Sequence, residues 1–244
     1  MECFRDLFTM DTEFRRMPIF LDASFTLIHP VEPVGLVYAR HLRKTTGLAL
    51  NPEEIQSAFH RAFTNASPPD YDNYCSGQNA EEDWWRNLVS QILASIVPDS
   101  ASVLDPDVFE IYFNSLFEHF AEPSSWGLYP ETIDFLAAAS NLGPLAVLSN
   151  FDNRLTPILD GLGIGPFFEH IITSADARSR KPDRAVFDLA LDRLNCSPRE
   201  TFHCGDSLHA DYGGASALGL NAFHLQRPGH TLFNFLDFCR GFAH

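Results

Sequence analysis

Hydrophobic and polar positions follow two different patterns along the chain, and the pattern changes near residues 30 and 126. Short runs of apolar and strand-forming residues, several of them ending on a polar residue, lie at 18–21, 145–148, 170–173, 201–204 and 221–225. Runs of this length are typical of parallel strands that are buried on both faces. We therefore expect a parallel sheet that is built from these segments.

Helices are expected between these strands and in one long block after the first strand. A helical pattern covers 34–46, and Asn51 followed by Pro52 predicts the start of the next helix. The other predicted helices lie at 80–96 with Asn79 as the capping residue, 106–121, 130–140, 154–162, 183–194 and 210–218. Strands that alternate with helices predict a doubly wound α/β core. The block without strands predicts an inserted subdomain, so we expect a core of 16–29 and 127–244, a helical insert of 30–126 and an N-terminal extension of 1–15.

Polar residues follow three of the predicted strands. Asp22 follows the first strand, Ser149 and Asn150 follow the second, and Asp206 follows the strand that ends at Cys204. In doubly wound sheets, ligands bind beyond the carboxyl ends of the strands. These side chains are therefore expected to converge on one site. His203 and Cys204 are expected to be buried residues of their strand.

The net negative charge of the chain disfavours anionic partners. There are 17 Lys and Arg residues against 32 Asp and Glu residues, which gives a net charge of −15. Such a field repels nucleic acid and anionic membranes, so neither is expected as a partner. It also repels anionic substrates, and a phosphate site in this chain would need a metal ion or local cations.

Cysteine usage and the N-terminal segment indicate a cellular location. The five cysteines are scattered without a C-x-x-C pair, which favours free thiols in a reducing compartment. The first residues carry acids and no long apolar stretch, and no run approaches the ~18 apolar residues of a membrane span. A cytoplasmic location is expected, and an organelle is not excluded.

Four short segments carry the candidate chemistry. They are Leu21-Asp22-Ala23-Ser24-Phe25-Thr26-Leu27, Val147-Leu148-Ser149-Asn150, Lys181-Pro182-Asp183 and Gly205-Asp206-Ser207-Leu208-His209-Ala210-Asp211. Their order and their positions at strand ends resemble the four signature motifs of the haloacid dehalogenase superfamily. The Trp84–Trp85 pair and the stretch 149–152 are similar to one group within it. The resemblance implies a Rossmann-like α/β core with an inserted helical cap, and a Mg²⁺-dependent site for a phosphoryl group.

The resemblance also implies a role for each residue of the motifs. Asp22 would be the nucleophile and a metal ligand, with Asp206, Asp211 (bound directly or through water) and the backbone carbonyl of Ser24 completing the Mg²⁺ site. Ser149 and Asn150 would bind the phosphoryl oxygens, and the ammonium group of Lys181 would face Asp22 and the transferred group. Ser24, Asn150 and Thr26 are the residues expected to contact the substrate. Carboxylate and carbonyl oxygens are ligands that suit Mg²⁺, and an aspartate can form an aspartyl-phosphate.

One position departs from the family pattern. Phosphatases of the superfamily carry a second Asp two residues after the nucleophile as general acid and base, and this chain has Ser24 there. Losing general acid–base catalysis typically costs roughly 10²–10⁴-fold in rate. The site could work slowly, or act on substrates whose leaving groups need no proton. It could also form a longer-lived phosphoenzyme, or bind without turnover.

Two functions from different classes remain in view. The first is a Mg²⁺-dependent hydrolase of a small phosphorylated molecule, and the second is a catalytically weak or inactive binding protein on the same scaffold. A purely structural scaffold is a third reading. Dehalogenation fits poorly, because Gly205-Asp206 is intact, and a phosphonatase would need a cap lysine where the insert has only Lys44. The sequence does not predict the substrate or the oligomeric state.

Overall fold

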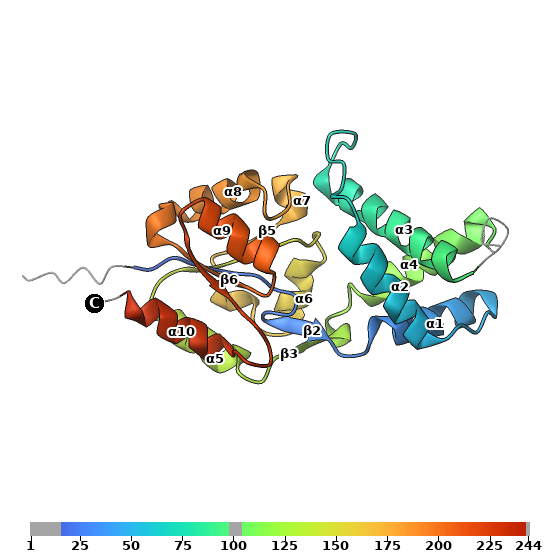
Figure 1. The fold of residues 1–244 in the computed structure, drawn as a ribbon, viewed down its shortest axis with the longest axis horizontal. Helices are drawn as coiled ribbons and strands as arrows, with labels where there is room; N and C mark the ends of the chain where they lie inside the picture. The colour runs from blue at the N-terminus through green and yellow to red at the C-terminus, as the bar shows by residue number, and fades with distance from the viewer. Residues whose placement is uncertain (1–15, 98–103, 243–244) are drawn as a thin grey trace, which may run out of the picture.

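A five-stranded parallel sheet forms the centre of the protein, in a computed structural model that describes residues 16–97 and 104–242 (Figure 1). The strand order is β5-β4-β1-β6-β7. The strands are β1 (Ile19–Leu21), β4 (Leu145–Ser149), β5 (His170–Thr173), β6 (Phe202–Gly205) and β7 (Asn221–His224). The predicted parallel α/β core is therefore confirmed. The predicted N-terminal extension lies outside the described residues.

The central strands are buried on both faces, which explains their continuous apolar sequences. Along β1, Ile19 and Leu21 belong to one hydrophobic cluster, whereas Phe20 between them belongs to another. Side chains along a strand alternate between the two faces, so each face of this strand packs against its own layer of helices. Polar side chains would be buried on either face of such a strand, so the first polar residue, Asp22, comes after its carboxyl end.

Helices cover both faces of the sheet and make three layers (Figure 1). One cluster contains residues of α5 (Thr132–Ala139), α6 (Leu155–Gly161) and α10 (Leu232–Gly241). The cluster on the other face contains residues of α8 (Arg184–Leu194) and α9 (Gly214–Ala217). The short helix α7 (Ser174–Ala177) follows β5, and the π-helix η5 (Leu208–Gly213) follows β6.

A separate group of helices forms the insert between β1 and β4. It contains α1 (Val34–Thr46), α2 (Pro52–Asn65), α3 (Gly77–Ile96) and α4 (Pro106–His119), which share their own hydrophobic cluster. An antiparallel pair of strands, β2 (Ile28–Pro30) and β3 (Trp126–Leu128), links this insert to the core. The insert is consistent with a cap domain. The predicted boundaries at 29/30 and 126/127 fall inside the two-stranded ribbon.

Several details of the sequence prediction are wrong. Helix α3 begins at Gly77 and not at residue 80, because the Ser76 side chain accepts a hydrogen bond from the Asn79 backbone N–H at 3.1 Å. Asn79 is therefore inside the helix. The ribbon of β2 and β3 was not expected, since each strand has only three residues and no alternation marks it. Helices α7 and α10 were also missed, whereas α1 and α2 have the expected starts.

The cap contacts the core through the start of α3. A Cβ at Gly77 would lie 1.9 Å from the Ala175 carbonyl oxygen, so only glycine allows the two backbones to approach this closely. One turn further on, Glu81 is fully buried and pairs with Arg180 of the core. The hydroxyl groups of Ser174 and Tyr71 also donate to Glu81. The guanidinium of Arg180 lies 3.9 Å from the ring centroid of Trp84.

The buried Glu81–Arg180 pair generates a prediction about stability. Replacing Glu81 with Gln leaves Arg180 without a counter-charge at a buried interface, which typically costs about 3–5 kcal/mol. The matched control is Glu82→Gln, since Glu82 is paired with Arg86 at 3.0 Å on the surface and such pairs contribute about 0–1 kcal/mol. Urea unfolding measures both free energies of unfolding. Equal losses in the two variants would contradict a role for this pair in holding the cap.

Candidate active site

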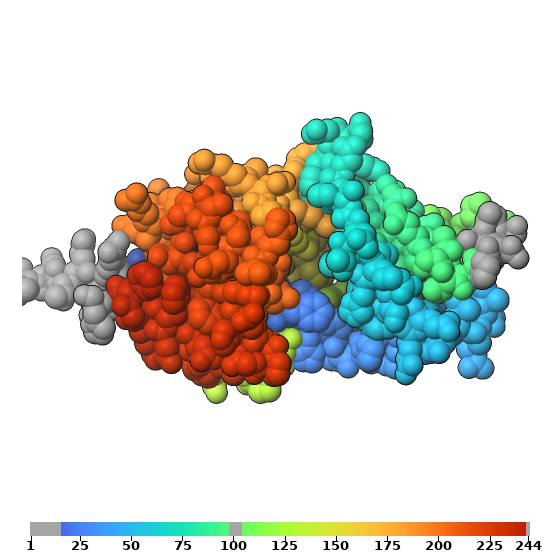
Figure 2. Space-filling view, in the orientation of Figure 1, coloured from blue at the N-terminus to red at the C-terminus, as the bar shows by residue number. Residues whose placement is uncertain are grey.

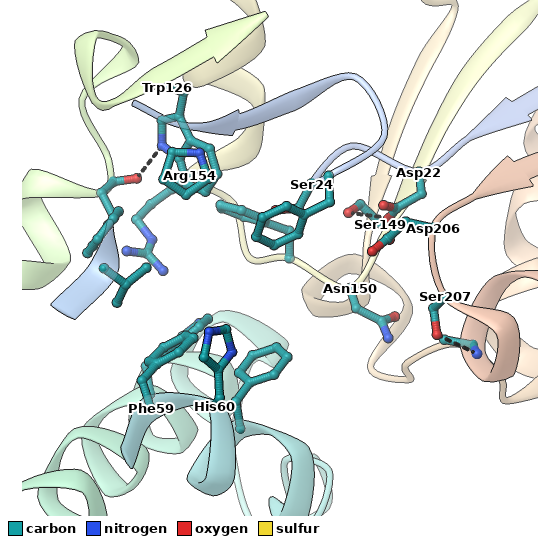
Figure 3. A pocket seen from close by; sticks show the side chains of 18 of the residues that line it. Asp22, Ser24, Phe59, His60, Trp126, Ser149, Asn150, Arg154, Asp206 and Ser207 are labelled. Atoms are coloured by element: carbon teal, nitrogen blue, oxygen red, sulfur yellow. Dashed lines mark hydrogen bonds between the residues drawn. The ribbon is translucent and has the colours of Figure 1, made fainter. Parts of the chain in front are cut away.

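The carboxyl ends of β1, β4 and β6 bring acidic and hydroxyl side chains to one place (Figure 3). Asp22 follows β1, Ser149 ends β4 and Asp206 follows β6, while Asp211 comes from η5. Carboxylate oxygens of Asp22, Asp206 and Asp211 all lie within 4.8 Å of one another. The expected convergence of Asp22, Ser149 and Asp206 is therefore present in the structure.

Lys181 supplies the positive charge at the centre of this cluster. Its ammonium group donates to Asp22 Oδ1 at 2.8 Å, to Asp211 Oδ1 at 2.6 Å and to the Leu148 carbonyl at 2.6 Å. All three N–H donors of the ammonium are thus engaged, and the residue is only 4% exposed. Lys181 therefore holds two carboxylates that would otherwise repel each other.

Asp22 is oriented by hydroxyl groups in addition to Lys181. The Ser149 hydroxyl donates to Asp22 Oδ1 at 2.9 Å, and the Thr26 hydroxyl lies 3.3 Å from Oδ2. Thr26 is fully buried and is not among the residues that line the cavity above the site, and the substrate contact expected from the sequence stays a prediction. Ser149 reaches both the carboxylate and the cavity.

Asn150 fixes the loop that carries Lys181. Its side-chain amide donates to the Lys181 carbonyl at 2.9 Å and its carbonyl oxygen accepts from the Lys181 backbone N–H at 2.8 Å. Asn150 also lines the cavity, so the expected contact with a phosphoryl group stays a prediction. The pair of backbone contacts was not foreseen, because nothing in the sequence links residues 31 positions apart.

Asp211 contacts His203, a residue that was not predicted from the sequence to be functional. His203 is buried in β6, as expected, and its Nε2 lies 3.0 Å from Asp211 Oδ1. The Ser207 backbone N–H donates to Asp211 Oδ2 at 3.0 Å. Both oxygens of Asp211 are therefore already bonded, an arrangement that favours contact with a metal through water over direct ligation.

The electrostatics follow from burial and from these contacts. Burial opposes the charge of Lys181, but Asp211 and Asp22 outweigh it and raise its pKa above the ordinary value. Burial raises the pKa of Asp22 despite the attraction of Lys181. Burial also acts to raise the pKa of Asp211, but Lys181 and His203 reverse the effect and lower it. The positive charge of Lys181 alone therefore does not offset the cost of burying the ionised Asp22 carboxylate.

Asp206 has the least support of the three carboxylates. No other residue in the described ranges donates a hydrogen bond to its side chain, although it lies beside Asp22 and Asp211. Loss of hydration and repulsion by these two carboxylates raise its pKa to about 7. Hard oxygen ligands at this spacing suit Mg²⁺, and a divalent cation would balance the unpaired charge. The residues present thus fit the metal that the sequence predicted.

The loop after β1 carries Ser24 into the cavity (Figure 3). Within the part of the chain that the structure describes, nothing donates to the Ser24 carbonyl and no base contacts its hydroxyl. The free carbonyl is compatible with the predicted metal ligand, which remains a prediction. Phe25 next to it has a φ of 59° and is 51% exposed, so its ring faces the cavity at some cost in backbone energy.

A cavity of about 490 Å³ extends from the carboxylates to the cap. Figure 2 shows the surface hollowed between the core and the helices of the cap. The far wall is aromatic, with Phe59, Phe63, Trp85, Phe117 and Trp126 among its residues. His60 of the cap and Arg154 of the core are its other basic groups besides Lys181. Sequence reasoning missed this wall, because a helical pattern of apolar residues does not separate a core face from a cavity.

A family described as haloacid dehalogenase-like hydrolase matches residues 19–219. The chain therefore belongs to the haloacid dehalogenase-like hydrolases. It is 32% identical over 211 residues to haloacid dehalogenase-like hydrolase domain-containing protein 3 of Danio rerio, covering 86% of this chain and 84% of that protein. The likeness to one group within the superfamily, inferred from the sequence, is confirmed.

Two solved structures share the fold. YfnB from Bacillus subtilis, a HAD hydrolase bound to magnesium, has a TM-score of 0.68 at 16% identity, covering 92% of this chain and 99% of that chain. A HAD phosphatase from Thermococcus onnurineus has a TM-score of 0.63 at 20% identity, covering 91% and 97%. At these identities the likeness establishes the fold alone. None of the described helices is long and apolar enough to cross a membrane.

Because no other described residue donates a hydrogen bond to the Asp206 carboxylate, we expect its ionisation to make the stability of the metal-free protein depend on pH. Its pKa is about 7 in the folded state against an ordinary value of 3.8, so between these values the folded state holds more protons than the unfolded state. Stability of the metal-free protein therefore falls as the pH rises through this range, and Asp206→Asn removes the loss. The variant should melt higher than wild type near pH 8 without Mg²⁺, and the gap should narrow near pH 4.

Added Mg²⁺ should reverse this order at the higher pH, since an ion that binds only the folded state stabilises it by mass action. Wild type should then gain thermal stability while Asp206→Asn gains little. Asp134→Asn, at an exposed position on α5, is the control and should respond like wild type. An equal Mg²⁺ shift in all three proteins would exclude Asp206 as a ligand.

Proposed function

We propose that this protein is a Mg²⁺-dependent hydrolase of a small phosphorylated molecule, which acts through an aspartyl-phosphate on Asp22. One observation carries the proposal. Asp22 lies at the end of β1, held by Lys181 at 2.8 Å and Ser149 at 2.9 Å, beside two further carboxylates and open to a cavity. A carboxylate held in this way is suited to attack at phosphorus.

Each residue has a defined part in the proposed reaction. Asp22 attacks phosphorus with one carboxylate oxygen, the bond from phosphorus to the leaving oxygen breaks, and that oxygen keeps the electron pair. Water then attacks the acyl phosphate, which restores Asp22 and releases phosphate. Lys181 and Ser149 hold Asp22 in the orientation for attack, and the ammonium of Lys181 places positive charge beside the transferred group. Asn150 keeps Lys181 in register by fixing its backbone.

Asp22, Asp206 and Asp211 would hold the Mg²⁺, with the last of these through water, and the Ser24 carbonyl is the fourth candidate ligand. When bound, the ion neutralises the developing charge on the phosphoryl oxygens. This assignment agrees with the chemistry of the donor set, because hard oxygen ligands favour Mg²⁺ over softer metals.

A binding protein without turnover is the second candidate. It is favoured by Ser24, whose hydroxyl makes no hydrogen bond to a base among the described residues and, unlike a carboxylic acid, does not release a proton readily near neutral pH. The same scaffold would then bind a phosphorylated ligand through the metal and Lys181 without cleaving it. The two candidates differ in whether Asp22 is consumed and regenerated.

Hydrolysis of p-nitrophenyl phosphate separates these candidates. Its leaving group needs little help from an acid, so we expect turnover that requires Mg²⁺ and falls to background in Asp22→Asn. Asp134→Asn serves as the control and should retain the activity. Release of p-nitrophenol is followed by absorbance. Equal background in wild type and Asp22→Asn would argue for the binding protein.

A further inference from the structure

We infer that the substrate is an aryl phosphate, meaning a phosphate monoester of a phenol, whose ring occupies the cavity under the cap. The inference rests on the proposed function and deepens it by naming the leaving group. Two separate observations lead to it, namely the chemistry of the cavity wall and the absence of an acid at Ser24.

The wall opposite the carboxylates is built to hold a flat apolar group. Phe59 and Phe63 of α2 stack with ring centroids 5.6 Å apart, and Phe63 lies 6.0 Å from Trp85 of α3. Trp126 packs edge to face with Phe151 at 5.6 Å. These rings pack against one another, and their surfaces that line the cavity can bind a further ring by stacking and edge contacts. The volume of about 490 Å³ suits a small organic molecule.

Among the described residues that line the cavity, Lys181 and Arg154 are already engaged and do not offer their charge to a second anionic group. Lys181 is saturated by Asp22, Asp211 and Leu148. Arg154 donates to the Asp152 carboxylate through Nε at 2.8 Å and Nη2 at 2.7 Å, and to the Phe117 carbonyl at 3.0 Å. Its guanidinium also stacks 3.6 Å from the Phe117 ring centroid. Sugar bisphosphates and phosphorylated acids carry a second anionic group besides the phosphoryl group that reacts, and neither Lys181 nor Arg154 is available to bind it.

The remaining basic residue on the lining, His60, already contacts a neighbouring side chain. His60 is exposed, and its Nε2 lies 2.9 Å from the Gln56 amide nitrogen. With a net charge of −15, the chain also disfavours any ligand that carries more anionic groups than the reaction requires. The phosphoryl group is thus the one charged part that the cavity accommodates.

The leaving group must depart without a proton, because Ser24 replaces the acid. A phenol ionises near a pKa of ~10, like the tyrosine side chain. An alcohol resembles water, whose pKa is ~15.7, and its alkoxide is a far poorer leaving group. A phenolate can leave with its electron pair and take a proton afterwards from the phosphate that hydrolysis releases. The aromatic wall and the missing acid thus select the same class of ester.

A comparison of three substrates tests the inference. Phenyl and benzyl phosphate carry the same ring but differ in the acidity of the leaving group, and acetyl phosphate needs neither the wall nor an acid. With Mg²⁺, we expect turnover of acetyl and phenyl phosphate. The kcat/KM for phenyl phosphate should exceed that for benzyl phosphate by about 10²-fold or more. Benzyl phosphate should still bind, seen as competitive inhibition and as a change in the fluorescence of Trp85 and Trp126.

Two variants separate the leaving-group effect from the wall. Ser24→Asp supplies the missing acid and should raise benzyl phosphate hydrolysis about 10²-fold, with a smaller gain for phenyl phosphate. Phe63→Ala removes an exposed ring of the wall and should raise the KM for phenyl phosphate roughly 2- to 10-fold. Ile111→Ala is the control, since Ile111 is 60% exposed on α4 and does not line the cavity.

The possible outcomes test the aryl phosphate assignment separately from the proposed hydrolase activity. Turnover of acetyl phosphate that requires Asp22, combined with equal kcat/KM for phenyl and benzyl phosphate, overturns the aryl assignment and leaves the hydrolase intact. An unchanged KM in Phe63→Ala, or no binding of benzyl phosphate, likewise overturns the role of the wall. No turnover of acetyl phosphate by wild type overturns the proposed function and the aryl assignment together.

Discussion

The structure depends on a single ammonium group placed between carboxylates. Lys181 bridges Asp22 and Asp211, whose oxygens lie within 4.8 Å of each other in a region with little access to water. Two carboxylates at this distance cannot both ionise without a cation nearby. Lys181 compensates part of this charge but donates its three hydrogen bonds to Asp22, Asp211 and the Leu148 carbonyl rather than to Asp206, so a divalent ion would complement the site. The proposed nucleophile, metal ligands and phosphoryl position are all chosen from this balance of charges.

The loop that carries Lys181 links the two parts of the molecule. Asn150 holds the Lys181 backbone from the end of β4, and the preceding residue, Arg180, reaches the buried Glu81 of the cap. The cap therefore contacts the core one residue away from the central cation. This proximity gives a physical route by which the position of the cap can affect the orientation of Asp22, and it places the aromatic wall over the same site.

Much of this could be predicted from the sequence, because the signals are local. The apolar run before Asp22 and the strand–turn segments around Ser149 and Asp206 set the parallel sheet, and parallel strands bring their carboxyl ends to one edge. The pairing of Glu81 with Arg180 and the use of His203 under Asp211 could not be predicted, since both depend on tertiary packing. The same holds for the aromatic wall and for Thr26, whose burial only the fold reveals.

The proposed reaction requires that Asp22 becomes phosphorylated when a phosphoryl donor meets this arrangement of charges. Mass spectrometry of protein that is quenched in acid during incubation with acetyl phosphate and Mg²⁺ detects this intermediate, because the acid denatures the protein and stops turnover before the acyl phosphate is hydrolysed. We expect one added phosphoryl group on the peptide that contains Asp22, and none when Mg²⁺ is withheld. Phosphate on another residue, or an unmodified peptide while substrate is being consumed, would contradict it.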